Sequence, residues 1–208
     1  MQVAERAWVR LPSGKHLDLL HPSAADWDDE DLALGLARTY RWGGHSAWRH
    51  PLSVAQHSLT VMHLRRLDAE QASDDPRLLL RELLHDAEEG LLGFDPLSVL
   101  KPYLGEAFRA LTDRLAAAVA QRYALPDWDE IGYRLHKKAD RLAAASEALH
   151  VAGWPATEVR DILGITLPPL QDDVLQPIYG DLAWEPWPAE LAYTRFLACL
   201  QELQRQAL

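Results

Sequence analysis

Apolar residues recur three and four positions apart along most of the chain, which is the spacing of an amphipathic α-helix. These repeats predict helices over residues 27–39, from Ser53 onward, from Pro76 to near Gly90, from Leu104 to a break at Leu125-Pro126, over about 25 residues from Asp127, and over 188–206. The pattern therefore predicts an all-α protein.

Residues that cap helices stand where several of these repeats begin. Asp26 is placed to cap the first helix, with acidic residues following in its first turn. Ser53-Val54-Ala55-Gln56 and Asp127-Trp128-Asp129-Glu130 each match a capping box, and Pro76 suits a first helical position. The local signals thus agree with the apolar periodicity on where the helices start.

Two stretches depart from the helical pattern. Residues 8–20 alternate apolar and polar around a Pro-Ser-Gly-Lys turn, which predicts a short β-hairpin covering the domain. Residues 154–187 contain closely spaced prolines that exclude long helices, and a loop of this length usually covers a site or an interface. We expect one domain over 1–208, with the motif-bearing core at about 27–152 and a loop and helix at 153–208.

Composition narrows the kinds of partner. With 208 residues, 48% of them hydrophobic, the chain can bury a full-sized core. Its 21 basic and 31 acidic residues give a net charge of −10, and a nucleic-acid polymer needs a basic surface to bind its phosphates. We expect no nucleic-acid polymer as partner, whereas a small anionic substrate in a local basic pocket stays open.

Cysteine usage and the length of the apolar runs favour the cytoplasm. Cys199 is the single cysteine, which excludes an internal disulfide and a Cys-rich zinc site. The first residues lack the order of a signal peptide, and no apolar run approaches the roughly 18 residues of a membrane span. We expect a cytoplasmic chain with no membrane partner, and a homodimer stays open.

The stretch Arg81-Glu82-Leu83-Leu84-His85-Asp86-Ala87-Glu88-Glu89 concentrates groups that bind metals or move protons. On one continuous helix, Glu89 would lie beside both His85 and Asp86, with leucines on the opposite side. A His-Asp pair is weak evidence by itself, since a histidine packed in a core and a solvated aspartate give the same dipeptide. Its interpretation depends on partners elsewhere in the chain.

Two further residues sit near apolar stripes on predicted helices. Val54, Val61 and Leu64 predict an inward stripe that includes His57, although a lone histidine there is more often a core residue than a ligand. Asp140 borders the buried side of the helix after Asp127, where a carboxylate must be paired, capped or metal-bound. A salt bridge from Asp140 to Lys137 is the plain alternative.

The loop over residues 41–51 is rich in cationic, imidazole and aromatic side chains and contains two adjacent glycines. Loops of this composition often bind ligands. This loop is therefore a candidate ligand-binding segment, against the alternative of an ordinary surface loop in which Trp42 and Trp48 only pack.

Together, His57, His85, Asp86 and Asp140 place two imidazoles and two carboxylates near buried surfaces. Such a set suits a divalent first-row ion with coordination positions left for water. Glu89 would then act as a base or orient that water. The sequence thus indicates a catalytic metal site.

In these motifs the chain resembles the HD-domain metal-dependent phosphohydrolases, which are named for an H…HD…D ligand set. Three pieces spread over about residues 30–150 carry the resemblance: Ser53-Val54-Ala55-Gln56-His57-Ser58, Leu83-Leu84-His85-Asp86-Ala87-Glu88-Glu89 and Lys138-Ala139-Asp140-Arg141-Leu142. It is most similar to the bacterial and phage 5′-deoxynucleotidases, in which an Arg-Trp pair ahead of the first ligand histidine contacts phosphate and sugar. Arg41-Trp42 has that place here.

The resemblance implies an HD-domain helical bundle with one divalent ion per site, which could be Mn, Co, Mg, Fe, Ni or Zn. It implies that His57, His85, Asp86 and Asp140 are the ligands, that Glu89 helps to activate water, and that Arg41 and Trp42 hold the nucleotide. Asp95 would fill a second acidic role, although it follows Gly93-Phe94 and is displaced by one residue from the family's Gly-Asp. Lys101 is a further candidate cation for the phosphate.

We therefore expect a metal-dependent phosphohydrolase of small nucleotides, acting on deoxynucleoside 5′-monophosphates. The alternatives are a dNTP triphosphohydrolase, which needs more cationic residues along a longer pocket, and a non-catalytic nucleotide-binding sensor that keeps the fold and the metal.

Overall fold

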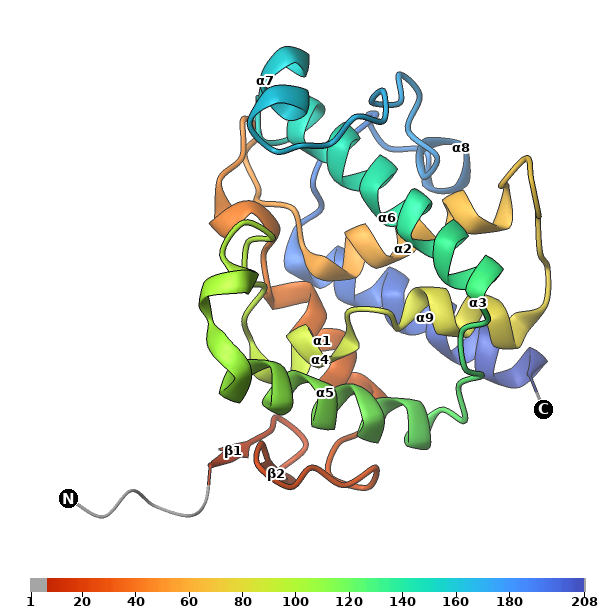
Figure 1. The fold of residues 1–208 in the computed structure, drawn as a ribbon. Coiled ribbons are helices and arrows are strands. Elements are labelled where there is room, and N and C mark those ends of the chain that lie inside the picture. The colour runs from red at the N-terminus through yellow and green to blue at the C-terminus, as the bar shows by residue number, and fades with distance from the viewer. Residues whose placement is uncertain (1–6, 208) are drawn as a thin grey trace.

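A computed structural model describes residues 7–207 and shows an all-α protein with a short N-terminal hairpin (Figure 1). Within these residues the elements are β1 (Trp8–Arg10), β2 (His16–Asp18), α1 (Asp29–Arg38), the 3₁₀ helix η1 (Arg41–Gly44), α2 (Val54–Arg66), α3 (Pro76–Leu83), α4 (Ala87–Leu92), the 3₁₀ helix η2 (Lys101–Tyr103), α5 (Gly105–Arg122), α6 (Glu130–His150), α7 (Ala156–Asp161), α8 (Gln176–Tyr179) and α9 (Ala189–Gln206). The predicted fold class and the hairpin are confirmed.

Helix α2 lies at the centre of the bundle. It packs against α1, α3, α6 and α9, and in Figure 1 α6 crosses in front of it while α9 passes behind. Every residue of α2 except Leu64 and Arg66 is buried. Val54, His57 and Val61 of the expected inward stripe are fully buried, and Leu64 is not; the burial extends around the rest of the helix because neighbours cover it on several sides. Its polar side chains, His57 among them, must find partners inside the protein.

The helix starts differ from the expected ones in their capping residues. Helix α1 begins at Asp29, where the backbone N–H of Asp28 donates to Asp31 at 3.0 Å. Asp26 instead accepts from the backbone N–H of Ser23 at 3.0 Å, so it closes the preceding turn and is not the cap. The α6 cap is Asp129, which accepts from the backbone N–H of the third helical residue at 2.6 Å.

The Ser53–Gln56 capping box is only half formed. Ser53 accepts from the backbone N–H of Gln56 at 3.2 Å, as expected. The Gln56 amide, however, donates to the Glu185 carbonyl at 3.0 Å and accepts from the Trp187 N–H at 2.8 Å. Because Gln56 is buried beside this later segment, its side chain ties the end of the 154–187 stretch to α2.

The remaining segments cover the core. In the hairpin, Leu17 is fully buried and packs into the main core with Trp27. The 154–187 stretch contains only the short helices α7 and α8, in agreement with its prolines.

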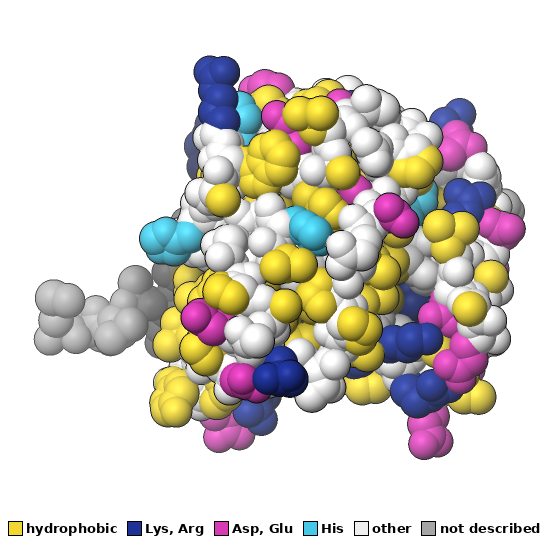
Figure 2. Space-filling view, turned by 90° about the horizontal axis from the view of Figure 1, so that it is seen from above, with side chains coloured by type: hydrophobic (Ala, Val, Ile, Leu, Met, Phe, Trp, Pro, Cys, Tyr) yellow, Lys and Arg dark blue, Asp and Glu magenta, His cyan; other side chains and the backbone are white. Residues whose placement is uncertain are grey.

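No helix within residues 7–207 is both long and apolar enough to span a membrane. On the face seen from above in Figure 2, apolar side chains lie across the middle, and acidic and basic ones are mixed mostly around the edge.

Helices α1 and α4 approach each other through a pair of glycines. A Cβ added at Gly35 would lie 2.2 Å from the carbonyl oxygen of Gly90, and one added at Gly90 would lie 2.8 Å from the backbone nitrogen of Leu36. Both contacts are with backbone, which cannot move aside as a side chain can. The glycines therefore set how closely α4 lies against α1.

We expect Gly35→Ala to lower the free energy of unfolding by at least about 1–3 kcal/mol, because the added methyl overpacks the α1–α4 contact. Chemical denaturation followed by circular dichroism measures this.

Ala117→Gly, at an exposed position in the interior of α5, is the control. It measures helix propensity alone, which is worth about 1 kcal/mol and would make Gly35→Ala stabilising if no contact intervened. An unchanged or raised stability in Gly35→Ala would contradict the close approach.

Candidate metal centre

The helix expected to carry His85 and Asp86 is interrupted at those residues. Helix α3 ends at Leu83, α4 begins at Ala87, and the three residues between them form a turn. The expected continuous helix over 76–90 is therefore wrong. Adjacent side chains on a helix point about 100° apart, whereas here the Asp86 Oδ2 atom lies 3.2 Å from the His85 Nε2 atom. The break brings the two side chains together.

The turn also fixes the tautomer of His85. Its Nδ1 lies 2.8 Å from the backbone carbonyl oxygen of Glu82. A carbonyl only accepts hydrogen bonds, so Nδ1 must carry a proton and donate. In the neutral ring, Nε2 then presents its lone pair to the site.

His57 reaches the same point from α2. Its side chain is fully buried, and its ring centroid lies 5.3 Å from that of His85. Its Nδ1 lies 2.5 Å from Glu147 Oε1, so its Nε2 is the nitrogen that faces the site. His57 and His85, two of the ligand candidates named from the sequence, therefore lie side by side.

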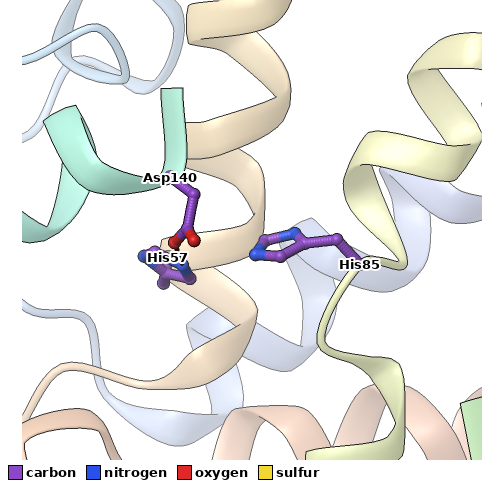
Figure 3. Close-up of side chains that lie close together, drawn as sticks. All are labelled: His57, His85 and Asp140. Carbon is purple, nitrogen blue, oxygen red and sulfur yellow. Dashed lines mark ion pairs between the residues drawn. The ribbon is translucent and has the colours of Figure 1, made fainter. Parts of the chain in front are cut away.

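Asp140 comes from α6 and also faces His57. Its Oδ1 lies 3.5 Å from His57 Nε2, and its Oδ2 accepts from Lys137 Nζ at 2.9 Å. The salt bridge considered as the alternative is thus present, but it leaves the other carboxylate oxygen at the site. One ligand atom each from His57, His85 and Asp140 lie within 4.8 Å of one another (Figure 3).

These donors fit a divalent metal ion. The Nε2 atoms of His57 and His85 are buried and have no hydrogen-bond partner among residues 7–207. A buried polar atom left in this way is costly unless something binds it. Asp86 Oδ2 lies beside this group, 3.7 Å from His57 Nε2 and 3.2 Å from His85 Nε2. Imidazole and carboxylate donors suit a metal ion, and Asp86 and Asp140 are partly exposed, which leaves solvent access.

The electrostatics of the cluster favour a cation. Burial and Arg41 both oppose protonation of His57, but its contacts with Glu147 and Asp140 outweigh them and raise its pKa to about 9. Burial alone would raise the pKa of Asp86 and Asp140, yet the neighbouring histidines hold both well below the usual range of an aspartate. The carboxylates therefore stay charged, and a metal ion would replace the protons that balance them.

Arg41 and Trp42 lie on η1 at the edge of this cluster. The Arg41 Nη1 atom is 3.9 Å from Asp86 Oδ2 and 3.7 Å from Asp95 Oδ2. Trp42 has a left-handed backbone, with φ of 58°, and packs against the apolar cluster of Ala145, Ala148 and Val159. The packing role considered for Trp42 is thus part of its environment, and Arg41 places a guanidinium beside the candidate ligand Asp86.

Glu89, Asp95 and Lys101 form the other border of the site. Glu89 follows the break, in the first turn of α4, and its Oε1 lies 3.3 Å from Lys101 Nζ. Its Oε2 is buried without a hydrogen-bond partner among the described residues. Burial, followed by the charges of Asp86 and Asp95, raises the pKa of Glu89 to about 10. The displaced Asp95 faces Arg41, so it joins the site through that guanidinium.

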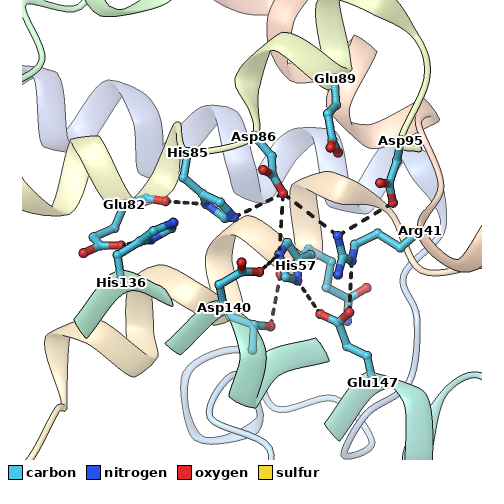
Figure 4. Close-up of polar contacts among 12 residues, drawn as sticks. Arg41, His57, Glu82, His85, Asp86, Glu89, Asp95, His136, Asp140 and Glu147 are labelled. Carbon is cyan, nitrogen blue, oxygen red and sulfur yellow. Dashed lines mark hydrogen bonds and ion pairs between the residues drawn. The ribbon is translucent and has the colours of Figure 1, made fainter. Parts of the chain in front are cut away.

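The sequence analysis missed Glu147, which is buried on α6 (Figure 4). Its Oε2 accepts from Arg41 Nε at 3.0 Å and from Trp42 Nε1 at 3.4 Å, while its Oε1 faces His57. A signal existed, because Glu147 follows Asp140 by seven residues and so lies two helical turns along the same face.

A second missed group supports His85 from behind. Glu82 Oε2 lies 2.8 Å from Nδ1 of His136, and Arg65 Nε donates to Glu82 Oε1 at 2.9 Å. The His136 ring packs edge-on against His85, with centroids 4.9 Å apart. His136 precedes Asp140 by one helical turn, which is the pattern that could have revealed it.

Comparison with known proteins places the chain in a family. No protein-family model matches it. It is 40% identical over 161 residues to a Rhodobacter capsulatus protein described as uncharacterized, and the match covers 77% of this chain and 81% of that protein. The chain belongs to the family of that Rhodobacter protein. The description names no activity, so function must be argued from the site.

We expect His57→Ala and Asp140→Ala each to abolish binding of a divalent metal, because each removes a donor that the remaining side chains cannot replace. Elemental analysis after loading with Mn²⁺ should fall from about one ion per chain to near zero, while far-UV circular dichroism stays helical.

Two exposed residues provide matched controls. His21→Ala and Asp113→Ala remove the same side-chain types away from the site and should leave the metal content unchanged. A folded His57→Ala or Asp140→Ala protein that keeps about one ion per chain would show that the ligand assignment is wrong.

Proposed function

We propose that the chain is an HD-domain phosphohydrolase that releases phosphate from deoxynucleoside 5′-monophosphates. The observation that carries this proposal is the position of Arg41, whose guanidinium is held 3.9 Å from Asp86 at the edge of the candidate metal cluster. A fixed guanidinium beside a metal site suits a phosphate, which it can grip with two N–H groups.

The fold supports the proposal by bringing His57, His85 and Asp140 together, with Asp86 beside the two histidines. His57 comes from α2, His85 and Asp86 from the break after α3, and Asp140 from α6. These four residues would hold the ion, which supplies an acidified water and a Lewis acid for the phosphate. Its identity among Mn, Co, Mg, Fe, Ni and Zn is for metal-loading experiments to determine.

Glu89 is the proposed proton-transfer group. Its raised pKa comes from burial and from neighbouring negative charges, Asp86 foremost. A cation held by Asp86 would cancel that charge and bring the Glu89 pKa toward the range in which a carboxylate takes and returns a proton near neutral pH. Lys101, which contacts Glu89, would add positive charge beside the phosphate.

The balance of charge favours a monophosphate over a triphosphate. Among residues 7–207, the lysines and arginines in ion-pair contact with the cluster are Arg41, Lys101 and Lys137. Lys137 is already paired with Asp140. Arg41 and Lys101 suit the charge of one phosphate, whereas a triphosphate carries more. A cytoplasmic location, where free nucleotides occur, is part of this proposal.

A phosphate-release screen over nucleoside mono-, di- and triphosphates, run with Mn²⁺, Co²⁺ and Mg²⁺ in turn, tests the function. We expect the highest rates with deoxynucleoside monophosphates. Glu89→Gln should lower kcat at least about a hundredfold, the scale of a lost acid–base group, while the protein still binds metal.

Each other outcome has its own meaning. Release from triphosphates alone would indicate the triphosphohydrolase, and binding without release would indicate a non-catalytic nucleotide sensor. Loss of metal in Glu89→Gln would make Glu89 a ligand.

We expect Arg41→Ala and Trp42→Ala to have different effects on substrate choice. Arg41→Ala should raise KM at least about tenfold, because a charge-assisted hydrogen bond of roughly 1.5–3 kcal/mol is lost. Trp42→Ala should lower the ratio of kcat/KM for dAMP to that for AMP, because removing the indole ring makes room for the extra hydroxyl of ribose. Steady-state kinetics on the two nucleotides measure both effects.

Trp48→Ala is the control, because Trp48 lies on the same loop but belongs to a different apolar cluster, with Leu52 and Val151. An unchanged ratio of kcat/KM for dAMP and AMP in Trp42→Ala would leave Trp42 with its packing role alone.

A further inference from the structure

Glu147 is a buried carboxylate whose two oxygens face different parts of the site. Oε1 lies 2.5 Å from Nδ1 of the candidate ligand His57. Oε2 accepts from Nε of Arg41 and Nε1 of Trp42, the candidate substrate residues. Figure 4 shows the Glu147 carboxylate reaching both His57 and Arg41. The Glu147 side chain thus contacts both a candidate metal ligand and the candidate substrate residues.

The first oxygen controls how His57 presents its nitrogens. The other oxygen of Glu147, Oε2, already accepts from the N–H groups of Arg41 and Trp42, so the Glu147 side chain acts as a hydrogen-bond acceptor here. Nδ1 of His57 must therefore donate to it, and Nε2 keeps its lone pair for the site once the ring is neutral. A carboxylate behind a ligand histidine commonly fixes the ring in this way.

The second oxygen controls where Arg41 points. By accepting from Nε, it leaves the Nη groups of Arg41 directed toward Asp86 and Asp95. The Trp42 indole N–H shares the same oxygen, which helps to hold a residue whose backbone is left-handed. A non-glycine residue held in this conformation needs support from its surroundings.

We propose that Glu147 is a positioning residue that aligns His57 for the metal and Arg41 for the substrate phosphate, and so couples metal binding to phosphate binding. The inference rests on the proposed function for the identity of the phosphate site. A buried ion pair kept only for the fold is the alternative. Such pairs often contribute little to stability, so stability alone would not explain this one.

The test uses binding, so it does not depend on turnover. In Glu147→Gln we expect the affinity for Mn²⁺, measured by titration calorimetry, to fall about ten- to a hundredfold, the scale seen when a carboxylate behind a ligand histidine is removed. Binding of inorganic phosphate to the Mn²⁺-saturated protein should weaken as well. Glu130→Gln, at the exposed start of α6, is the matched control and should change neither affinity.

Two further variants separate positioning from charge. Glu147→Asp keeps the buried charge but shortens the side chain by one methylene, so it cannot span His57 and Arg41. Glu147→Asp should therefore also bind Mn²⁺ more weakly. It replaces Glu147→Gln in the test if Glu147→Gln does not fold. In an Arg41→Ala background, Glu147→Gln should weaken Mn²⁺ binding but have no further effect on phosphate.

The outcomes distinguish this inference from the proposed function. Folded Glu147→Gln and Glu147→Asp proteins with Mn²⁺ and phosphate affinities within about twofold of wild type would overturn the inference, as would additive effects of Glu147→Gln and Arg41→Ala on phosphate binding. Wild-type protein that binds Mn²⁺ and phosphate but releases phosphate from no nucleotide would overturn the proposed function alone. The binding measurements on the Glu147 variants would still test the positioning role.

Discussion

The burial of His57 is the constraint on which the rest of the site depends. Its helix, α2, is enclosed by α1, α3, α6 and α9, so the imidazole has no contact with water and must be satisfied inside the protein. Glu147 satisfies one nitrogen. The other points to the place where His85 and Asp140 arrive from neighbouring helices. An enclosed polar residue on the central helix thus requires polar partners from the helices packed around it.

Charge is the second organising feature. Asp86, Asp95 and Asp140 lie with Glu89 and Glu147 around a small volume that Arg41 enters from η1. Burial, with repulsion from Asp86 and Asp95, raises the pKa of Glu89, whereas the neighbouring histidines hold the pKa values of Asp86 and Asp140 well below the usual range of an aspartate. Bound cations relieve repulsion between carboxylates, so a metal ion would stabilise this arrangement.

Backbone contacts set the distances within the site. The Gly35–Gly90 approach draws α4 onto α1, and the turn before α4 carries His85 and Asp86. The end of α1 leads through residues 39–40 to Arg41. Two parts of the site, one with candidate ligands and the other with the cation, therefore depend on the same close contact between helices.

The sequence by itself determined the all-α class, the hairpin, most helix positions and the residue types of the candidate site, because periodicity and short motifs are local properties. It did not predict the break at residues 84–86, since the apolar repeat of leucines continues through the turn. It also missed Glu147 and the group formed by Arg65, Glu82 and His136. Those contacts join residues far apart in the chain, with Glu147 and His57 separated by 90 positions. A periodic pattern shows which face of a helix is buried, but only tertiary packing decides which buried faces meet.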